Sequence, residues 1–164
     1  GHLYQCVYFR SQNPHPIRSM INFTGYDEGW ATYAELSSYD YSGLDPNVAL
    51  ILKSNMIATH CIYSRADIGI HYENWDYNKT KEYLSQFVSE SSCKAIYRTL
   101  LEEPAIYLPY SIGYLEFADL KTTAMQMLGS RFDEKQFHTF LLNIGPCDFG
   151  TLRDAMIDWI NSIV

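Results

Sequence analysis

The spacing of apolar residues is the feature that most narrows the folds open to this chain. Apolar side chains recur at three- and four-residue intervals along most of the sequence, and no segment alternates apolar and polar residues for more than a few positions. The first pattern is typical of helices that bury one face, whereas half-buried strands need the second. We therefore predict an all-α fold, with residues 1–164 forming a single helical domain.

Capping signals divide the chain into helices. Asp45-Pro46 predicts a helix start, because aspartate caps helix N-termini and proline suits the first helical position; this helix is expected to run to about His71. Capping boxes that begin at Thr24 and Asp133 predict two further starts, and Asp148 is expected to cap the last helix. The remaining helices are predicted over about 78–88, 92–101 and 109–128.

The same spacing predicts which side chains are buried. Two aromatic pairs at helical spacing are expected in the core: Trp30 with Tyr33, and Phe137 with Phe140. Along the long helix after Asp45 we expect the inward face to include Val48, Ile51, Leu52, Ala66 and Ile70.

Composition excludes several classes of protein. Hydrophobic residues make up 47% of the chain and charged residues 19%, which excludes an intrinsically disordered protein. The formal net charge of −7 argues against nucleic acid or an anionic membrane as the main partner. No run approaches the roughly 18 apolar residues of a membrane span. The four widely spaced cysteines are most simply reduced thiols, with one or two disulfides left open: Cys6, Cys61, Cys93 and Cys147.

Two of the expected helices carry polar residues on faces that packing alone does not require. Glu28, Thr32 and Glu35 share one stripe, and a second stripe on the long helix contains His60, Ser64, Asp67 and His71. All-α proteins form metal or acid–base sites from carboxylate and imidazole side chains on neighbouring helices. In the alternative interpretation neither stripe forms a site. Glu28 then interacts favourably with the dipole of its helix, and the histidine stripe faces solvent.

Segments spread over nearly the whole chain resemble, in order, a bacterial family of zinc-peptidase-like proteins catalogued as a domain of unknown function. The most specific segment is Glu28-Gly-Trp-Ala-Thr-Tyr33. Weaker ones are Gly1-His-Leu-Tyr-Gln5, Asn13-Pro-His-Pro-Ile-Arg18, Asp67-Ile-Gly-Ile-His71, Glu103-Pro-Ala-Ile-Tyr-Leu-Pro-Tyr-Ser-Ile-Gly-Tyr-Leu-Glu116 and Phe137-His-Thr-Phe-Leu-Leu-Asn-Ile-Gly-Pro146. The chain departs from the family at Pro104-Ala105-Ile106, where many relatives carry Pro-Gly-Gln, and at Pro109.

The resemblance implies a zinc site that this chain shares with residues preceding it. In the family a His-Glu-x-x-Pro-Gly-His motif opens the metal site, and Gly1-His2 matches its last two residues. His2 and Glu28 would then be zinc ligands, while the first histidine and the catalytic glutamate would lie upstream of Gly1. That glutamate would act as general base on zinc-bound water.

The resemblance also implies roles for residues further along the chain. His71 and Tyr110 match positions that stabilise the transition state, where each would donate a hydrogen bond to the developing oxyanion. Asp67 would hold His71 in one orientation, and Glu35 would help to position Glu28 without binding the metal itself.

The leading hypothesis is that the parent polypeptide is a zinc metallohydrolase, most simply a peptidase acting on peptide substrates. This chain would be the C-terminal part of a larger helical metallopeptidase-like fold, with the N-terminal remainder of the parent as its partner. Because two ligands make an incomplete zinc site, the isolated chain is expected to be inactive and to bind zinc weakly. The resemblance makes an extracytoplasmic or cell-envelope location an expectation.

A non-enzymatic alternative is a helical peptide-binding or scaffold module whose site has decayed. The residues that precede Gly1 distinguish the two hypotheses, because an intact His-Glu there favours the enzyme. A cysteine nucleophile formed by Cys61 and His60 is disfavoured, since adjacent residues on a helix do not face each other.

Overall fold

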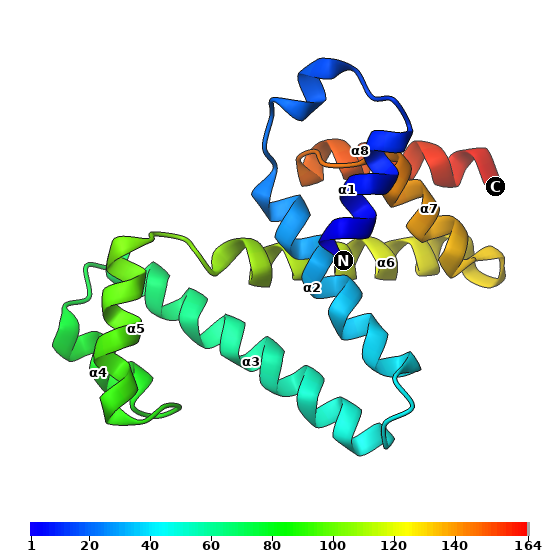
Figure 1. Ribbon diagram of the computed structural model, residues 1–164. Helices are drawn as coiled ribbons and strands as arrows, with labels where there is room; N and C mark the ends of the chain where they lie inside the picture. The colour runs from blue at the N-terminus through cyan, green and yellow to red at the C-terminus, as the bar shows by residue number, and fades with distance from the viewer. Residues whose placement is uncertain (164) are drawn as a thin grey trace. The chain divides into compact units, whose positions relative to one another are not determined.

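A computed structural model describes residues 1–163, and over these residues the chain is helical and contains no strand. Its helices, in chain order, are α1 (His2–Ser11), α2 (Thr24–Ser38), α3 (Pro46–His71), α4 (Tyr77–Leu84), α5 (Glu90–Glu102), α6 (Leu108–Leu128), α7 (Glu134–Ile144) and α8 (Phe149–Ile163) (Figure 1). Three short 3₁₀ turns, η1 (Pro16–Ser19), η2 (Tyr39–Tyr41) and η3 (Gly129–Arg131), lie between them. The all-α prediction is confirmed. None of the described helices is both long and apolar enough to cross a membrane.

Local sequence sets most of the helix boundaries. The Asp45 carboxylate accepts hydrogen bonds from the first backbone N–H groups of α3, and Pro46 is its first residue, as predicted. Asp133 and Asp148 accept backbone N–H groups in the same way at the starts of α7 and α8. The expected cap at Thr24 is wrong by one position, because the Phe23 carbonyl accepts the first helical hydrogen bond of α2.

The chain forms two compact units. Unit 1 comprises Gly1–Ser37 and Ile112–Val164, and unit 2 comprises Ser38–Ser111. Each unit has a core of buried apolar side chains of its own. The expectation of a single domain over residues 1–164 stays a prediction.

Unit 1 is built around an aromatic core. The two predicted aromatic pairs, Trp30 with Tyr33 and Phe137 with Phe140, are all buried, which confirms that part of the sequence analysis. The hydroxyl of Tyr26 donates to the Leu141 carbonyl at 2.8 Å, so the polar end of a buried ring is satisfied. In the same unit α1 packs on α7, and α7 packs on α8.

Within unit 1, α2 and α6 meet backbone to backbone at three glycines. A Cβ atom added to Gly29 would lie 2.5 Å from the Cα of Gly113, and one added to Gly113 would collide with the Gly25 carbonyl oxygen. Gly25 and Gly29 are one helical turn apart and therefore lie on one face of α2. Only glycine at positions 29 and 113 permits this approach, which sets the position of the helix segment that carries Glu28.

In unit 2, α3 packs with α4 and α5, which lie beside the C-terminal end of α3 (Figure 1). The C-terminal half of α3 buries Ala66 and Ile70 as predicted. The N-terminal half does not bury its predicted face, since Val48, Ile51 and Leu52 are 45%, 66% and 40% exposed. Helical spacing identified an apolar stripe there, but α4 and α5 do not extend along it. All four cysteines are free thiols.

Candidate metal and peptide site

The two predicted metal ligands meet in unit 1. His2 stands at the start of α1 and Glu28 in the first turns of α2, and the His2 Nε2 atom lies 3.1 Å from the Glu28 Oε2 atom. The Glu28 side chain is 23% exposed and that of His2 is 54% exposed. The pair is therefore anchored on two helices and remains open to solvent.

Contacts next to this pair hold α1 against α2. The buried Gln5 side chain donates its amide N–H to Asp27 Oδ1 at 3.1 Å. Burial raises the pKa of Asp27, and the hydrogen bond from Gln5 opposes that change. A Cβ atom on Gly1 would lie 2.8 Å from the Cα of Ala31, so the first residue of the chain rests directly on α2. These contacts place His2 over Glu28.

The geometry of the pair suits a zinc ion. Tetrahedral zinc with ligand bonds of about 2.1 Å separates two of its donor atoms by about 3.4 Å, and the His2–Glu28 separation of 3.1 Å is close to that. Imidazole nitrogen and carboxylate oxygen are both donors that zinc accepts. Among residues 1–163 no cluster of three or more His, Cys, Asp or Glu side chains could hold a metal. A zinc site built on this pair needs a further ligand from outside the described residues.

A cavity of about 350 Å³ adjoins the pair and is lined by both of its members. Its apolar walls include Phe9, Ile21 and Pro146, and its charged lining consists of Arg10, Arg18, Asp27 and Glu28. The sequence did not point to either arginine as a site residue. The signal that could have found Arg10 is its place on α1, eight residues after His2 and on the same helical face.

The polar stripe of α3 lies in unit 2 and packs on the segment that leads into α6. The Ser64 and Ser111 hydroxyls are 2.7 Å apart and buried, and the rings of His60 and Tyr110 have centroids 5.4 Å apart. Within the stripe Ser64 and Asp67 are buried, His60 is half-buried and His71 is exposed, so the solvent-facing interpretation fails only for the two middle residues. Tyr110 lies near the start of α6, as the sequence predicted.

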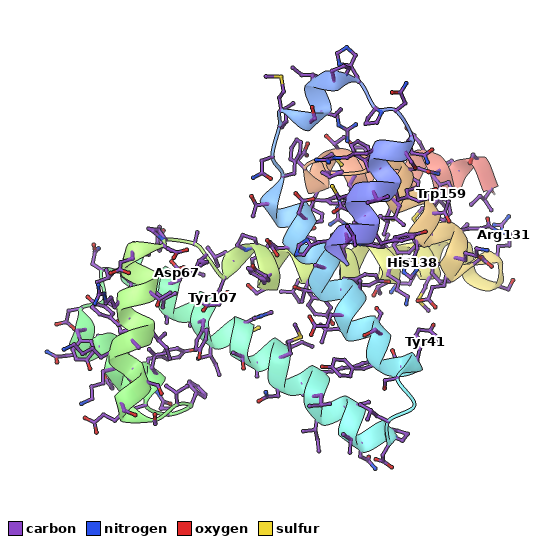
Figure 2. The ribbon with its side chains drawn as sticks, in the orientation of Figure 1. Tyr41, Asp67, Tyr107, Arg131, His138 and Trp159 are labelled. Atoms are coloured by element: carbon purple, nitrogen blue, oxygen red, sulfur yellow. The ribbon has the colours of Figure 1, made fainter. Side chains whose placement is uncertain are left out.

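Asp67 lies near the end of α3 (Figure 2), and His71, the last residue of that helix, follows it one turn later. Asp67 is only 2% exposed, and its Oδ1 atom lies 3.7 Å from His71 Nε2, which is too long for a hydrogen bond. The His71 Nε2–H group instead donates to the Leu100 carbonyl at 2.9 Å. The orientation of His71 thus depends on α5 at least as much as on Asp67.

The buried Asp67 carboxylate also binds the turn before α6. It accepts a hydrogen bond from the backbone N–H of Ala105, while its Oδ2 atom has no hydrogen-bond partner. Burial raises the pKa of Asp67, and the Ala105 hydrogen bond and His71 partly offset that increase. Ala105 has a φ of 66°, in the left-handed region that favours glycine. The family resemblance implies a glycine at this position.

The predicted site residues thus fall into two groups. His2, Glu28 and Glu35 belong to unit 1, with Glu35 exposed on α2, whereas Asp67, His71 and Tyr110 belong to unit 2. The structure brings His2 to Glu28 and Asp67 to His71. Joint action of the two groups stays a prediction.

Fold and site together define an all-α protein with a histidine–carboxylate pair beside an open cavity. Residues 1–156 match the family described as "Bacterial protein of unknown function (DUF885)", and the chain belongs to this family. It is also similar to a solved structure, "the putative lipoprotein from Colwellia psychrerythraea", with 26% sequence identity and a TM-score of 0.83. That match covers 99% of this chain and 28% of the other. A comparison with curated proteins finds no match.

Proposed function

We propose that the polypeptide to which this chain belongs is a zinc-dependent metallohydrolase that cleaves peptides, and that His2 and Glu28 are two of its metal ligands. The observation that carries the proposal is the 3.1 Å approach of His2 Nε2 to Glu28 Oε2 from two separate helices. The adjoining cavity supports it, because a hydrolase needs room for substrate beside the metal.

Zinc, when bound, would lower the pKa of a coordinated water toward about 7 and polarise a substrate carbonyl. His2 and Glu28 would fix the position of the ion on helices held together by the Gln5–Asp27 hydrogen bond. Tyr110 and His71 are proposed to donate hydrogen bonds to the negative charge that develops on the substrate carbonyl oxygen.

The hydrogen bond from His71 to Leu100 constrains how His71 could take part. Since Nε2–H is already donated to a backbone carbonyl, only Nδ1 is left to face a substrate. A neutral ring would then offer an acceptor, whereas donation to an oxyanion requires a proton on both nitrogens. The proposed role of His71 therefore uses its imidazolium form.

The description of the solved relative as a lipoprotein supports an extracytoplasmic or cell-envelope location as part of this proposal. The zinc content of the purified intact polypeptide tests the central claim. We expect about one zinc per chain and peptide hydrolysis that a chelator abolishes. The Glu28→Gln variant should lose at least about nine-tenths of its zinc, because a neutral amide is a poor ligand.

Glu82→Gln provides a matched control, since Glu82 is an exposed residue of α4 whose carboxylate pairs with Lys79. This variant should keep its zinc. A Glu28→Gln protein that retains stoichiometric zinc would refute the assignment of Glu28. A wild-type polypeptide with neither zinc nor hydrolysis would favour the non-catalytic peptide-binding module instead.

A further inference from the structure

We propose that the cavity beside His2 and Glu28 is a subsite for the C-terminal end of a peptide, and that Arg10 binds its free carboxylate. This rests on the proposed function, because the metal-binding pair forms one end of the cavity. The occupant is thus a peptide whose terminal carboxylate lies downstream of the bond to be cleaved.

The first argument is the placement of Arg10 on α1. His2, Cys6, Phe9 and Arg10 follow the spacing i, i+4, i+7, i+8, so they share one helical face, and all four line the cavity. At a rise of about 1.5 Å per residue, Arg10 lies about 12 Å beyond His2 along the helix axis. An extended peptide advances about 3.3–3.6 Å per residue. About three residues would therefore fit between the metal end of the cavity and Arg10.

The second argument is that the two arginines of the cavity are engaged differently. Arg18 donates from Nη2 to the Ile144 and Pro146 carbonyls at 2.9 and 2.8 Å, and its guanidinium lies 5.0 Å from the centroid of the Phe9 ring. The Arg10 residue is exposed, and no hydrogen bond or ion pair joins its guanidinium group to another described residue. Its planar fork of donors remains available for a carboxylate.

The third argument is the balance of charge in the cavity. Its lining contains two guanidinium groups and two carboxylates. Asp27 accepts a hydrogen bond from Gln5, and Glu28 faces His2, where a metal would neutralise it. With a divalent cation present the lining is net positive, which favours an anionic ligand. The walls formed by Phe9, Ile21 and Pro146 suit the apolar side chains of a peptide.

Calorimetric binding measurements on the intact, zinc-loaded polypeptide test the subsite without turnover. The probes are an N-acetylated tripeptide with a free carboxylate, the same peptide as its C-terminal amide, and an amide whose last residue is aspartate. We expect the amide to bind at least about tenfold more weakly than the acid, because it cannot form the charged pair with Arg10. The aspartyl amide should bind like the plain amide, since the subsite recognises a chain terminus.

Variants of Arg10 show whether this residue is responsible. In Arg10→Ala the acid and the amide should bind equally, and Arg10→Lys should restore part of the preference because it keeps the charge but not the planar fork. Arg98→Ala removes another exposed arginine, one that pairs with Glu102, and should leave the preference unchanged. Thermal unfolding of Arg10→Ala should match wild type, since the exposed Arg10 side chain makes no hydrogen bond or ion pair with another described residue.

Several results would overturn the subsite. These are equal binding of acid and amide by wild type, a preference that survives in Arg10→Ala, and an aspartyl amide that binds as well as the acid. A preference that is greatest for acids with a single residue beyond the acetyl group would overturn its placement 12 Å from His2. Zinc content measured on the same samples separates the two proposals. Wild-type protein that contains no zinc would refute the proposed function. The comparison of acid and amide binding would still test the subsite.

Discussion

At Ala105 a side chain occupies a backbone conformation that suits glycine. The φ of 66° brings the alanine Cβ close to the backbone, at a cost of about 1–2 kcal/mol. The hydrogen bond from the Ala105 N–H group to the buried Asp67 carboxylate helps to hold the turn in this conformation. Glycine at this point would therefore remove that cost from the turn.

Replacing Ala105 by glycine should stabilise the polypeptide by about 1 kcal/mol, because glycine adopts positive φ without this cost. Thermal and urea unfolding would measure the gain. Ala95→Gly, at an exposed helical position of α5, is the matched control and should lose about 1 kcal/mol. A loss of stability in Ala105→Gly would contradict the explanation.

Asp67 should make stability depend on pH in a direction opposite to that of a salt-bridged carboxylate. Burial raises its pKa in the folded state, so the native protein binds this proton more readily than the unfolded chain. This contribution to the free energy of unfolding therefore falls as pH rises from about 4, the unfolded pKa, through the raised native value.

The Asp67→Asn variant isolates that contribution, because asparagine keeps an acceptor for the Ala105 N–H group and carries no charge. The free energy of unfolding of this variant should exceed that of wild type by the largest amount at neutral pH. The difference should shrink as the pH approaches about 4. Chemical denaturation at several pH values would measure this. An advantage that grows toward low pH would show that Asp67 is charged and paired in the native state. Asp154→Asn, at an exposed position of α8, serves as control.

At the scale of the elements, the crossing of α2 and α6 in unit 1 depends on glycine. Gly29→Ala would force its Cβ to within 2.5 Å of Gly113 and should destabilise the polypeptide by about 1–3 kcal/mol or more. Gly25→Ala is the control on the same helix, since its Cβ would meet only the Phe149 ring at an ordinary 3.6 Å. Gly25→Ala should be neutral or slightly stabilising. Similar melting temperatures for the two variants would argue against the close crossing.

The elements were largely predictable because their signals are local. Caps such as Asp45, Asp133 and Asp148 act on the residues beside them, so the sequence alone placed most of the helix starts. The inward face of α3 was predictable only where α4 and α5 cover it. Apolar spacing identifies a stripe but not the element that packs on it, which is why Ile51 was placed in the core and is exposed.

The candidate site was predictable only in part for a related reason. Motif resemblance pointed to His2 and Glu28, and the structure brings them together. Arg10 lies outside those motifs, and its relevance emerges only when α1 is seen beside the cavity. The hydrogen bond from His71 to Leu100 joins two helices and has no local signature.

At the scale of the whole molecule, this chain spans 28% of its solved relative and contributes two of the proposed zinc ligands. Residues 1–164 alone should bind zinc at least about 100-fold more weakly than the intact polypeptide, because affinity depends on a complete and preorganised ligand set. Competition with a chromophoric chelator would compare the two. Equal affinities would mean that the ligand set lies entirely within this chain.

The backbone contact at Gly29 has a consequence for the neighbouring carboxylate. Side chains that touch can adjust by changing rotamers, but two main chains in van der Waals contact have no such freedom. Glu28 precedes Gly29 directly, so its Cα lies next to this junction of two main chains. We expect a shift of α6 at Gly113 to displace the backbone of Glu28 as well, and so to change its separation from His2.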